Sequence, residues 1–304
     1  MASALAGVLL LLCLGSVVGN GFIIVSLATE WLLRRKLSPC DTLLASLGAS
    51  RFCLQWVVIG KCVYLFLCPQ AFPYNPAMQV FSFLWDFLNS VTLWLSTWLS
   101  IFYCVKITTF AHPAFLWLKG KVSRCVPWML LSSLGLSCFS SILFFIGNRR
   151  LYQNYLQRDR PRWNDTYSEL RRFYENFYFF PLKLAIWTVP TATFLLGMAL
   201  LITSLGRHAR QVLLIISGSQ DTRVQAHFRA LLTLISFTIL FTTHFLSLVL
   251  SSAVVFSFQD LRYGVWQVVL YVCTVLYPVI LLWSNPRLRA GLPGRCCLPG
   301  VAAS

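Results

Sequence analysis

Trp85 and Asn89 stand four residues apart in an apolar stretch, so a helix would place both side chains on one face. The indole offers a large flat apolar surface with one hydrogen-bond donor, and the amide both donates and accepts hydrogen bonds. Together these groups suit the recognition of small molecules rather than the breaking of a bond. The alternative interpretation is structural: a tryptophan at a membrane interface, beside an asparagine that bonds to a neighbouring helix.

Intramembrane charge is limited mainly to Asp86 and Arg51. A charged side chain inside a membrane is costly, and it is by default a functional candidate. Asp86 would either contact a cationic ligand or extend to water at the lipid headgroups. Arg51 must find acceptors among backbone carbonyls or polar side chains. It would serve either as a static polar clasp or as a switch whose partners differ between two conformations.

The residues do not predict an enzyme. The sequence contains no paired carboxylates, histidine-rich cluster, nucleophile elbow or reactive Cys-His motif. The histidines show neither His-x3-His spacing nor pairing with cysteine, so no metal site and no cofactor is predicted. Most of the 11 cysteines lie in apolar runs, where a thiol acts as a small hydrophobe, and they indicate no disulfide framework.

The composition is that of a membrane protein. Of 304 residues, 58% are hydrophobic and 11% are charged, against about 45–50% and about 25% in globular domains. The net charge of +16 could suggest a nucleic-acid partner, but such proteins carry basic stripes on a polar surface that this chain lacks. We therefore expect no nucleic-acid binding, and we interpret the positive charge as a signal of membrane topology.

Seven stretches are long and apolar enough to cross a bilayer, which takes about 20 residues. They are residues 6–28, 41–64, 79–105, 125–147, 181–205, 230–256 and 265–283. No internal repeat, low-complexity tract or long linker divides the chain. The predicted fold is therefore an all-α seven-transmembrane helix bundle that forms one domain over residues 1–304. Residues 284–304 would be a short cytoplasmic tail.

The lysines and arginines predict an N-terminus outside and a C-terminus inside. Residues 4–18 lack the basic start of a signal peptide, and the basic cluster 34–36 follows the first apolar run, which favours an uncleaved first helix. The loop 148–180 is an exception, because it is predicted outside yet is rich in arginine. Its sequon makes Asn164 a candidate glycosylation site, which supports the outer placement. On the inner side, Trp117 and Lys119 would anchor an amphipathic loop at the interface.

Several strings of sequence, in this order, resemble one receptor family. They are "NGFIIVSLATEW", "LSPCDTLLASLGASRFCLQW", "WLSTWLSIFYCVKITTFAHPAFLWLK", "LITSLGRHARQV", "DTRVQAHFRALLTLISF" and "ILLWSNPRLR". Over nearly the whole chain they are similar to the bitter taste (type 2 taste) receptors, a group of seven-helix G-protein-coupled receptors. The Asp-Arg-Tyr and Asn-Pro-x-x-Tyr motifs of rhodopsin-like receptors are absent. Two departures stand out: Tyr277-Pro278 replaces a common His-Ser or His-Pro pair, and Phe241 and His244 replace frequent tyrosines.

The resemblance implies a pocket for small bitter compounds in the outer part of the bundle. Trp85 and Asn89 match the residues that line the agonist site in similar receptors, and Gln267 matches a position that often contacts agonist. The candidate ligand-binding residues are Trp85, Asp86, Asn89, Phe241, His244, Gln267 and Tyr271. The candidate switch residues are Asn20 and Arg51, at the family's central polar positions, and Pro278. Pro190 is a second proline that would allow a kink.

The resemblance also implies an inner surface that activates a gustducin-type heterotrimeric G protein, followed by phospholipase C and calcium release. The candidate residues that face this partner are Tyr103, Lys106, His112, Lys119, Lys121, His208, Arg210, Arg223 and His227. Topology alone would place basic residues there. Cys296 and Cys297 are candidate palmitoylation sites. The protein implied is a multi-pass plasma-membrane receptor in contact with lipid.

The main alternative is a multi-pass transporter or channel for small molecules. Transporters usually have charged or broken helices around a site at the membrane midplane. Charge confined mainly to Arg51 and Asp86 favours the receptor, and a membrane enzyme is weaker still. Agonist-dependent GTP exchange would separate the receptor from both alternatives.

Overall fold

The computed structural model describes residues 2–35, 37–68, 75–108, 113–157, 172–215, 222–252 and 261–284. Within these ranges the regular structure is entirely helical. Seven long helices contain apolar stretches of sufficient length to cross a membrane. They are α1 (Ala2–Arg34), α2 (Pro39–Leu67), α3 (Pro76–Ile107), α5 (Val126–Gln157), α7 (Phe180–Ile215), α8 (Thr222–Ser252) and α9 (Leu261–Ser284). The predicted seven-helix all-α fold is therefore confirmed.

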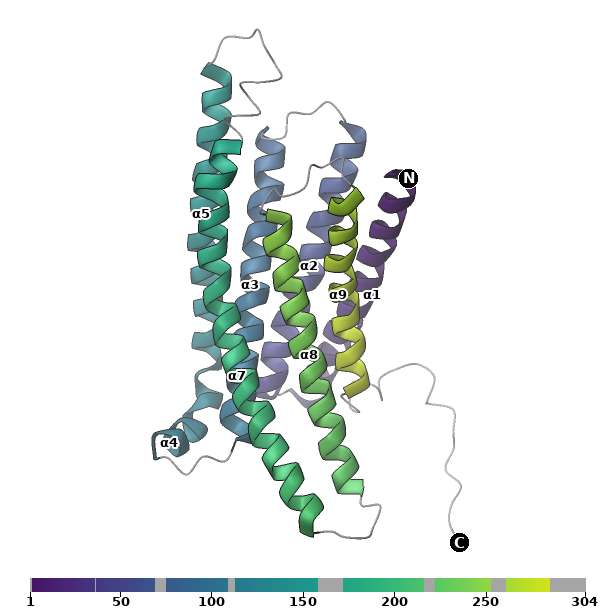
Figure 1. The fold of residues 1–304 in the computed structure, drawn as a ribbon, viewed down its shortest axis with the longest axis vertical. Coiled ribbons are helices and arrows are strands. Elements are labelled where there is room, and N and C mark those ends of the chain that lie inside the picture. Colours follow the sequence, from purple (N-terminus) through teal and green to yellow (C-terminus); the bar gives the residue numbers. More distant parts are fainter. Residues whose placement is uncertain are drawn as a thin grey trace.

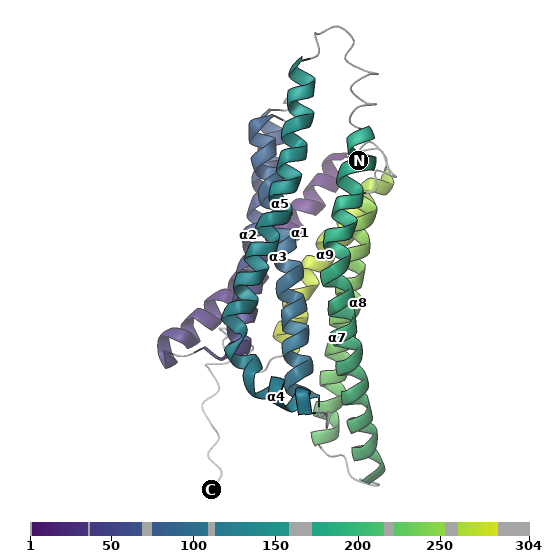
Figure 2. The same cartoon turned by 90° about the vertical axis from the view of Figure 1, so that its left-hand side faces the viewer.

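Shorter elements lie between the long helices in the described part of the chain. The helix α4 (Pro113–Lys121) and the 3-10 turn η1 (Val122–Arg124) join α3 to α5. The π-helical turn η2 (Glu175–Phe179) leads into α7. Figure 1 and Figure 2 both place α4 across one end of the bundle, the same end beyond which α7 and α8 extend.

Two of the long helices begin at sequence signals that satisfy free backbone N–H groups. The Ser38 hydroxyl accepts a hydrogen bond from the Asp41 N–H at 3.1 Å, and the Asn75 side chain accepts one from the Met78 N–H at 2.8 Å. A proline follows each cap, where its missing N–H costs nothing and its fixed φ suits the first turn. These caps define the starts of α2 and α3.

The helix α3 lies at the centre of the bundle. Of its most apolar window, 67% is buried, against 22% for α1. One apolar cluster joins α3 to α1, α2 and α5, and includes Ile23, Leu47 and Leu95. A second cluster joins α3 to α7, α8 and α9, and includes Leu93 and Trp187. Side chains on α3 are therefore positioned by packing on every side.

The outer surface of the bundle is apolar. Large hydrophobic side chains such as Leu11, Phe66, Trp128 and Leu196 are more than 60% exposed. Because the backbone of a helix is hydrogen-bonded internally, such a surface is compatible with lipid hydrocarbon. The exterior fits a protein embedded in a membrane.

Two glycines allow pairs of helices to approach closely. A Cβ atom at Gly19 of α1 would lie 2.8 Å from Pro278 Cγ of α9. A Cβ atom at Gly197 of α7 would lie 2.5 Å from Ser100 Oγ of α3. Small residues let helix backbones come together in membranes, so these contacts fix α9 against α1 and α7 against α3.

Candidate functional site

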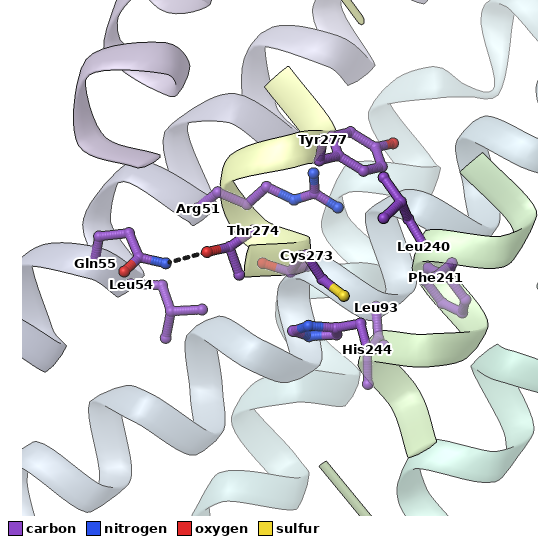
Figure 3. Close-up of a pocket in the computed structure, with 11 residues that line it drawn as sticks. Arg51, Leu54, Gln55, Leu93, Leu240, Phe241, His244, Cys273, Thr274 and Tyr277 are labelled. Atoms are coloured by element: carbon purple, nitrogen blue, oxygen red, sulfur yellow. Dashed lines mark hydrogen bonds between the residues drawn. The ribbon is translucent and has the colours of Figure 1, made fainter. Parts of the chain in front are cut away.

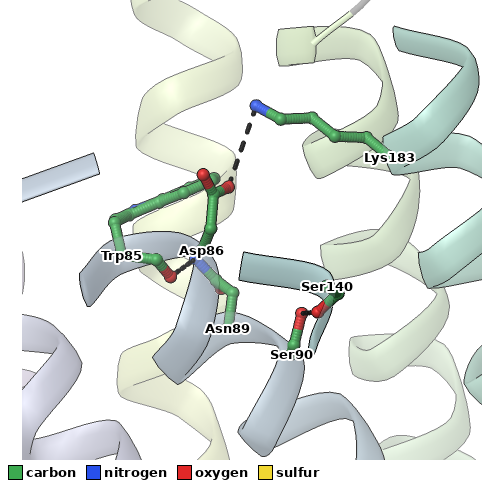
Figure 4. Close-up of polar contacts among 6 residues, drawn as sticks. All are labelled: Trp85, Asp86, Asn89, Ser90, Ser140 and Lys183. Carbon is green, nitrogen blue, oxygen red and sulfur yellow. Dashed lines mark hydrogen bonds and ion pairs between the residues drawn. The ribbon is translucent and has the colours of Figure 1, made fainter. Parts of the chain in front are cut away.

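Trp85 and Asn89 share one face of α3, as their spacing predicts, but they contact different partners. The Trp85 ring packs edge-on against Trp187 of α7, with 6.4 Å between ring centroids. Asn89 is 2% exposed, and its Nδ2 donates to the Trp85 carbonyl oxygen at 3.1 Å. Figure 4 shows this bond on α3, beside Asp86. The aromatic surface is therefore shared between α3 and α7.

Asp86 is buried between these helices. It is 4% exposed, and its Oδ1 lies 3.9 Å from Lys183 Nζ of α7 (Figure 4). The Lys183 ammonium also lies 5.6 Å from the ring centroids of both Trp85 and Trp187. Ion pairing and the ring faces both stabilise the ammonium. Asp86 is thus held inside the bundle by a cation, and the expectation that its side chain extends to headgroup water is not supported.

Lys183 is a functional candidate that the sequence interpretation missed. Besides Arg51 and Asp86, the lysines Lys61 and Lys183 also stand in the predicted spans 41–64 and 181–205. Lys61 on α2 is close enough to Asp86 for an electrostatic interaction. The signal was present in the sequence as a lysine within each apolar run. The sequence could not show that Lys183 pairs with Asp86 and that Lys61 lies near the same carboxylate.

A cavity of about 30 Å³ lies deeper in the bundle, between α2, α3, α8 and α9. Its polar lining is concentrated on α2 and α9, and its apolar lining comes largely from leucines and Phe241 (Figure 3). The predicted ligand residues Phe241 and His244 and the predicted switch residue Arg51 all line this space. Residues that the sequence predicts as ligand contacts and as a switch therefore line the same cavity.

Arg51 stacks on Tyr277 rather than forming an ion pair with a described residue. Its Cζ lies 3.3 Å from the Tyr277 ring centroid, and the residue is 8% exposed. Among the residues that the structure describes, its Nη1 has no hydrogen-bond partner. One turn along α2, Gln55 Nε2 donates to Thr274 Oγ1 of α9 at 3.3 Å, while Gln55 Oε1 is buried without a partner. The side chain of Arg51 thus extends toward α9, where it meets an aromatic ring in addition to polar groups.

Asn20 reaches the same part of α9 through a neighbour. Its Nδ2 donates to the Ser16 carbonyl at 2.9 Å and lies 3.2 Å from the Ser16 hydroxyl oxygen. The Ser16 hydroxyl in turn donates to the Thr274 carbonyl at 3.4 Å. Gly19 of α1 also packs against Pro278, and Arg51 of α2 stacks on Tyr277. The helices α1 and α2 therefore both contact residues 274–278 of α9. The predicted switch residues therefore converge on one segment.

The remaining predicted pocket residues are spread over α8 and α9. Phe241 stacks on Phe194 of α7 with 3.9 Å between ring centroids. Gln267 Nε2 donates to Ser251 Oγ of α8 at 3.4 Å. Tyr271 is half-buried, and its carbonyl accepts a hydrogen bond from Thr274 Oγ1 at 2.7 Å. Gln267 and Tyr271 thus make these contacts within α8 and α9, whereas Phe241 packs on α7 in the same apolar cluster as Trp85.

The kink proline Pro190 of α7 is tied to α3. Its carbonyl oxygen accepts a hydrogen bond from Thr97 Oγ1 at 2.8 Å. Three residues along α3, Ser100 Oγ donates to the Phe194 carbonyl at 3.2 Å. Proline prevents part of the normal helical bonding, and side chains from α3 add bonds at this point.

The inner-face residues differ in how they are placed. Tyr103 is half-buried, and its hydroxyl accepts a hydrogen bond from Cys40 Sγ at 3.1 Å. Lys106 is exposed at the end of α3, and Lys121 Nζ lies 4.2 Å from the Trp117 ring centroid. Lys119 is half-buried on α4, and His208 and Arg210 are exposed on α7.

Some predicted sites fall outside what the structure describes. His112 and Asn164, together with Cys296 and Cys297, lie outside the described residues. Arg223 and His227 belong to α8, but the positions of their side chains are also outside the description. These assignments stay predictions.

Comparison with known proteins decides the family. The family described as Taste receptor protein (TAS2R) matches residues 1–293. The chain is 58% identical over 294 residues to Taste receptor type 2 member 60 of Homo sapiens, covering 97% of this chain and 92% of that protein. It is 52% identical over 290 residues to Taste receptor type 2 member 135 of Mus musculus, covering 95% and 93%. The chain belongs to the type 2 taste receptor family.

Membership of this family confirms the resemblance drawn from the sequence strings. The chain is accordingly a bitter taste G-protein-coupled receptor and a multi-pass plasma-membrane protein, and it is not an enzyme. It has small-molecule ligands and couples to a G protein, as the receptor family implies. For a type 2 taste receptor, the buried Asp86–Lys183 pair and the Arg51 cavity are features of the bundle that require a functional account.

Proposed function

We propose that this receptor binds small bitter compounds on the outer part of α3, against Trp85 and Asn89, and activates a gustducin-type G protein at its opposite end. The observation that carries the proposal is the half-buried ring of Trp85, which packs on the buried Trp187 beside Lys183 and Asp86. Flat rings beside hydrogen-bonding and charged groups can contact many unrelated small molecules. Asp86, Phe241, His244, Gln267 and Tyr271 would complete the ligand contacts.

The ion pair changes the class of ligand that we expect. A lone Asp86 would favour cationic agonists, but Lys183 opposes it and Lys61 adds a second positive charge nearby. The group formed by Asp86, Lys183 and Lys61 therefore has no net negative charge. Neutral compounds with hydrogen-bonding groups suit it better than cations do, because a cation would have to displace an ammonium already in place.

The deep cavity supports an outer rather than an inner position for agonist in this conformation. Its volume of about 30 Å³ is far below the roughly 300 Å³ or more of sites for drug-sized ligands. Agonist against Trp85 and Asn89 would therefore lie mainly outside this cavity and reach its lining only at Phe241 and His244. A ligand shifts a receptor only if it binds two conformations unequally.

A calcium-response screen tests the proposal. Cells that express the receptor with a gustducin-type G protein are exposed to a panel of bitter compounds, and responses are compared among wild type, Trp85→Ala and Asn89→Ala. Both variants should lose or reshape the agonist response while surface expression is kept. Trp128→Ala is the matched control, because Trp128 is 70% exposed on the outside of α5. If agonists kept their wild-type potency on both test variants, the pocket would have to lie elsewhere in the receptor.

The same preparation separates a receptor from a transporter. Membranes with purified gustducin-type G protein should show agonist-dependent GTP exchange. Agonist accumulation inside vesicles without GTP exchange would contradict the coupling. Exchange with a different class of G protein alone would keep the receptor and overturn its gustducin-type partner.

A further inference from the structure

Arg51 is a buried cation with no carboxylate in contact among the described residues. It is 8% exposed and its Nη1 has no hydrogen-bond partner. The carboxylate of Asp86 is engaged with Lys183, about two turns along α3 from the cavity-lining residue Leu93. Removing an ion from water is costly unless another charge and hydrogen bonds compensate it. The charge of Arg51 therefore requires compensation that the described side chains do not fully supply.

Tyr277 compensates only one part of the guanidinium. The ring lies 3.3 Å from Arg51 Cζ, which places a π face over the plane of the cation (Figure 3). Tyr277 also lies within reach of a side-chain hydrogen bond to the guanidinium, but Nη1 has no partner among the described residues. Nη1 therefore keeps a donor available beside the cavity.

The cavity beside Arg51 has room for an ion and little more. A water molecule needs about 10–15 Å³ on the same measure, so about 30 Å³ holds roughly two small species. An unpartnered acceptor, Gln55 Oε1, lies one helical turn from Arg51 on the same face of α2. A water molecule there can donate one proton to Gln55 and the other to an anion. Both buried polar atoms would then have partners.

We propose that this cavity binds one small monovalent anion of the size and charge of chloride, held by Arg51 Nη1. The anion neutralises the buried cation within a space lined by α2, α3, α8 and α9. Because Arg51 and Gln55 are on α2 while Tyr277 and Thr274 are on α9, filling the site stabilises the contact of these two helices. The proposal does not depend on where the agonist binds.

Thermal unfolding of the purified full-length receptor in detergent tests the site. Chloride is titrated against gluconate at constant ionic strength, since gluconate is too large for the cavity. Wild type should show a saturable rise of a few degrees in Tm with chloride, because a ligand that binds only the folded state stabilises it. Bromide should replace chloride. Equal Tm values in chloride and gluconate would overturn the proposal.

Two variants and one control locate the effect. Gln55→Glu keeps the size of the side chain and supplies an internal carboxylate one turn from Arg51, so it should raise Tm in gluconate and lose the chloride response. Arg51→Gln should also lose the response. Arg124→Gln removes an exposed arginine outside the cavity and should keep it.

A chloride response that survives in Gln55→Glu would place the anion elsewhere and overturn the assignment. This variant decides the matter even if Arg51→Gln fails to fold.

Discussion

The charged side chains inside the bundle are held by different kinds of partner. Asp86 meets an ammonium, whereas Arg51 meets an aromatic ring and a small cavity. Breaking a buried ion pair leaves an uncompensated charge, which costs more than the pair contributes to stability. The two sites should therefore respond differently to substitution.

Lys183→Met should destabilise the receptor by about 1–3 kcal/mol, because it leaves the Asp86 carboxylate buried. The loss should stay below that for a fully enclosed pair, since the Lys183 side chain is 22% exposed and Lys61 remains nearby. Thermal unfolding in detergent measures it. The double variant Asp86→Asn, Lys183→Met should recover most of the lost stability. A double variant as unstable as the single one would show that the pair does not set the effect.

Arg51→Ala should reduce surface expression or the response to every agonist alike. Arg51 stacks on Tyr277, within the segment 274–278 of α9 that α1 and α2 both contact. Removal of the Arg51 side chain therefore weakens the packing of α9 as a whole. Surface labelling and calcium responses to several compounds provide the measurement. A loss confined to one compound would instead indicate a direct ligand contact.

Sequence spacing predicted which residues share a face but not what they touch. Trp85 and Asn89 were placed together correctly, because a helix fixes residues four apart. That Asn89 bonds its own helix, and that Trp187 covers Trp85, depends on the register of α3 against α7. Arg51 could be predicted to need partners inside the membrane. The ring of Tyr277 could not be predicted as the partner, because the sequence suggested hydrogen-bond acceptors.

At the scale of helices, the apolar runs identified every long element but not its full length. The helix α7 continues to Ile215, past the predicted span 181–205 and through Arg207 and Arg210. The apolar run of residues ends where the helix leaves the hydrocarbon of the bilayer. The helix itself continues as long as its backbone hydrogen bonds form. The starts at Ser38-Pro39 and Asn75-Pro76 carry readable capping signals. The π-helical turn η2 has no such signal.

Gly197→Val should destabilise the contact of α7 with α3 by about 1–3 kcal/mol, because the added side chain meets Ser100 Oγ at a close approach. Gly206→Val is the matched control on the same helix, since nothing lies within 4 Å of a Cβ there. Tm in detergent measures both. Combining Gly197→Ala with Ser100→Ala should be tolerated better than Gly197→Ala alone. Equal losses at Gly197 and Gly206 would show that helix propensity, not packing, is responsible.

At the scale of the whole molecule, the seven helices place the start of α1 and the end of α9 at opposite ends of the bundle (Figure 1). The distribution of lysine and arginine indicates which end of the bundle faces the cytosol. Lys106, Lys119, Lys121 and Arg124 gather at the end marked by α4, which favours that end as the inner one. The arginines of the loop 148–180 remain an exception that charge alone does not explain.

On intact cells, an epitope tag at the N-terminus should be labelled by antibody. A tag inserted at Gly120 of α4, where nothing lies within 4 Å of a Cβ, should be labelled only after permeabilisation. Surface labelling of the wild-type chain provides the reference. Labelling of the Gly120 tag on unpermeabilised cells would reverse the topology and remove the basis of the proposed G-protein surface.

The helix α7 extends, together with α8, beyond the end of the bundle that α4 marks (Figure 1). Thr97 and Ser100 of α3 hold α7 from Pro190 to Gly197, and the helix continues from there to Ile215. At 1.5 Å per residue the segment beyond Gly197 is about 27 Å long, so a tilt of about 5° at Gly197 would move its end by roughly 2 Å. A tilt small enough to keep the packing of α7 on α3 would thus move the end of α7 further than its middle, at the end of the bundle where another protein would bind.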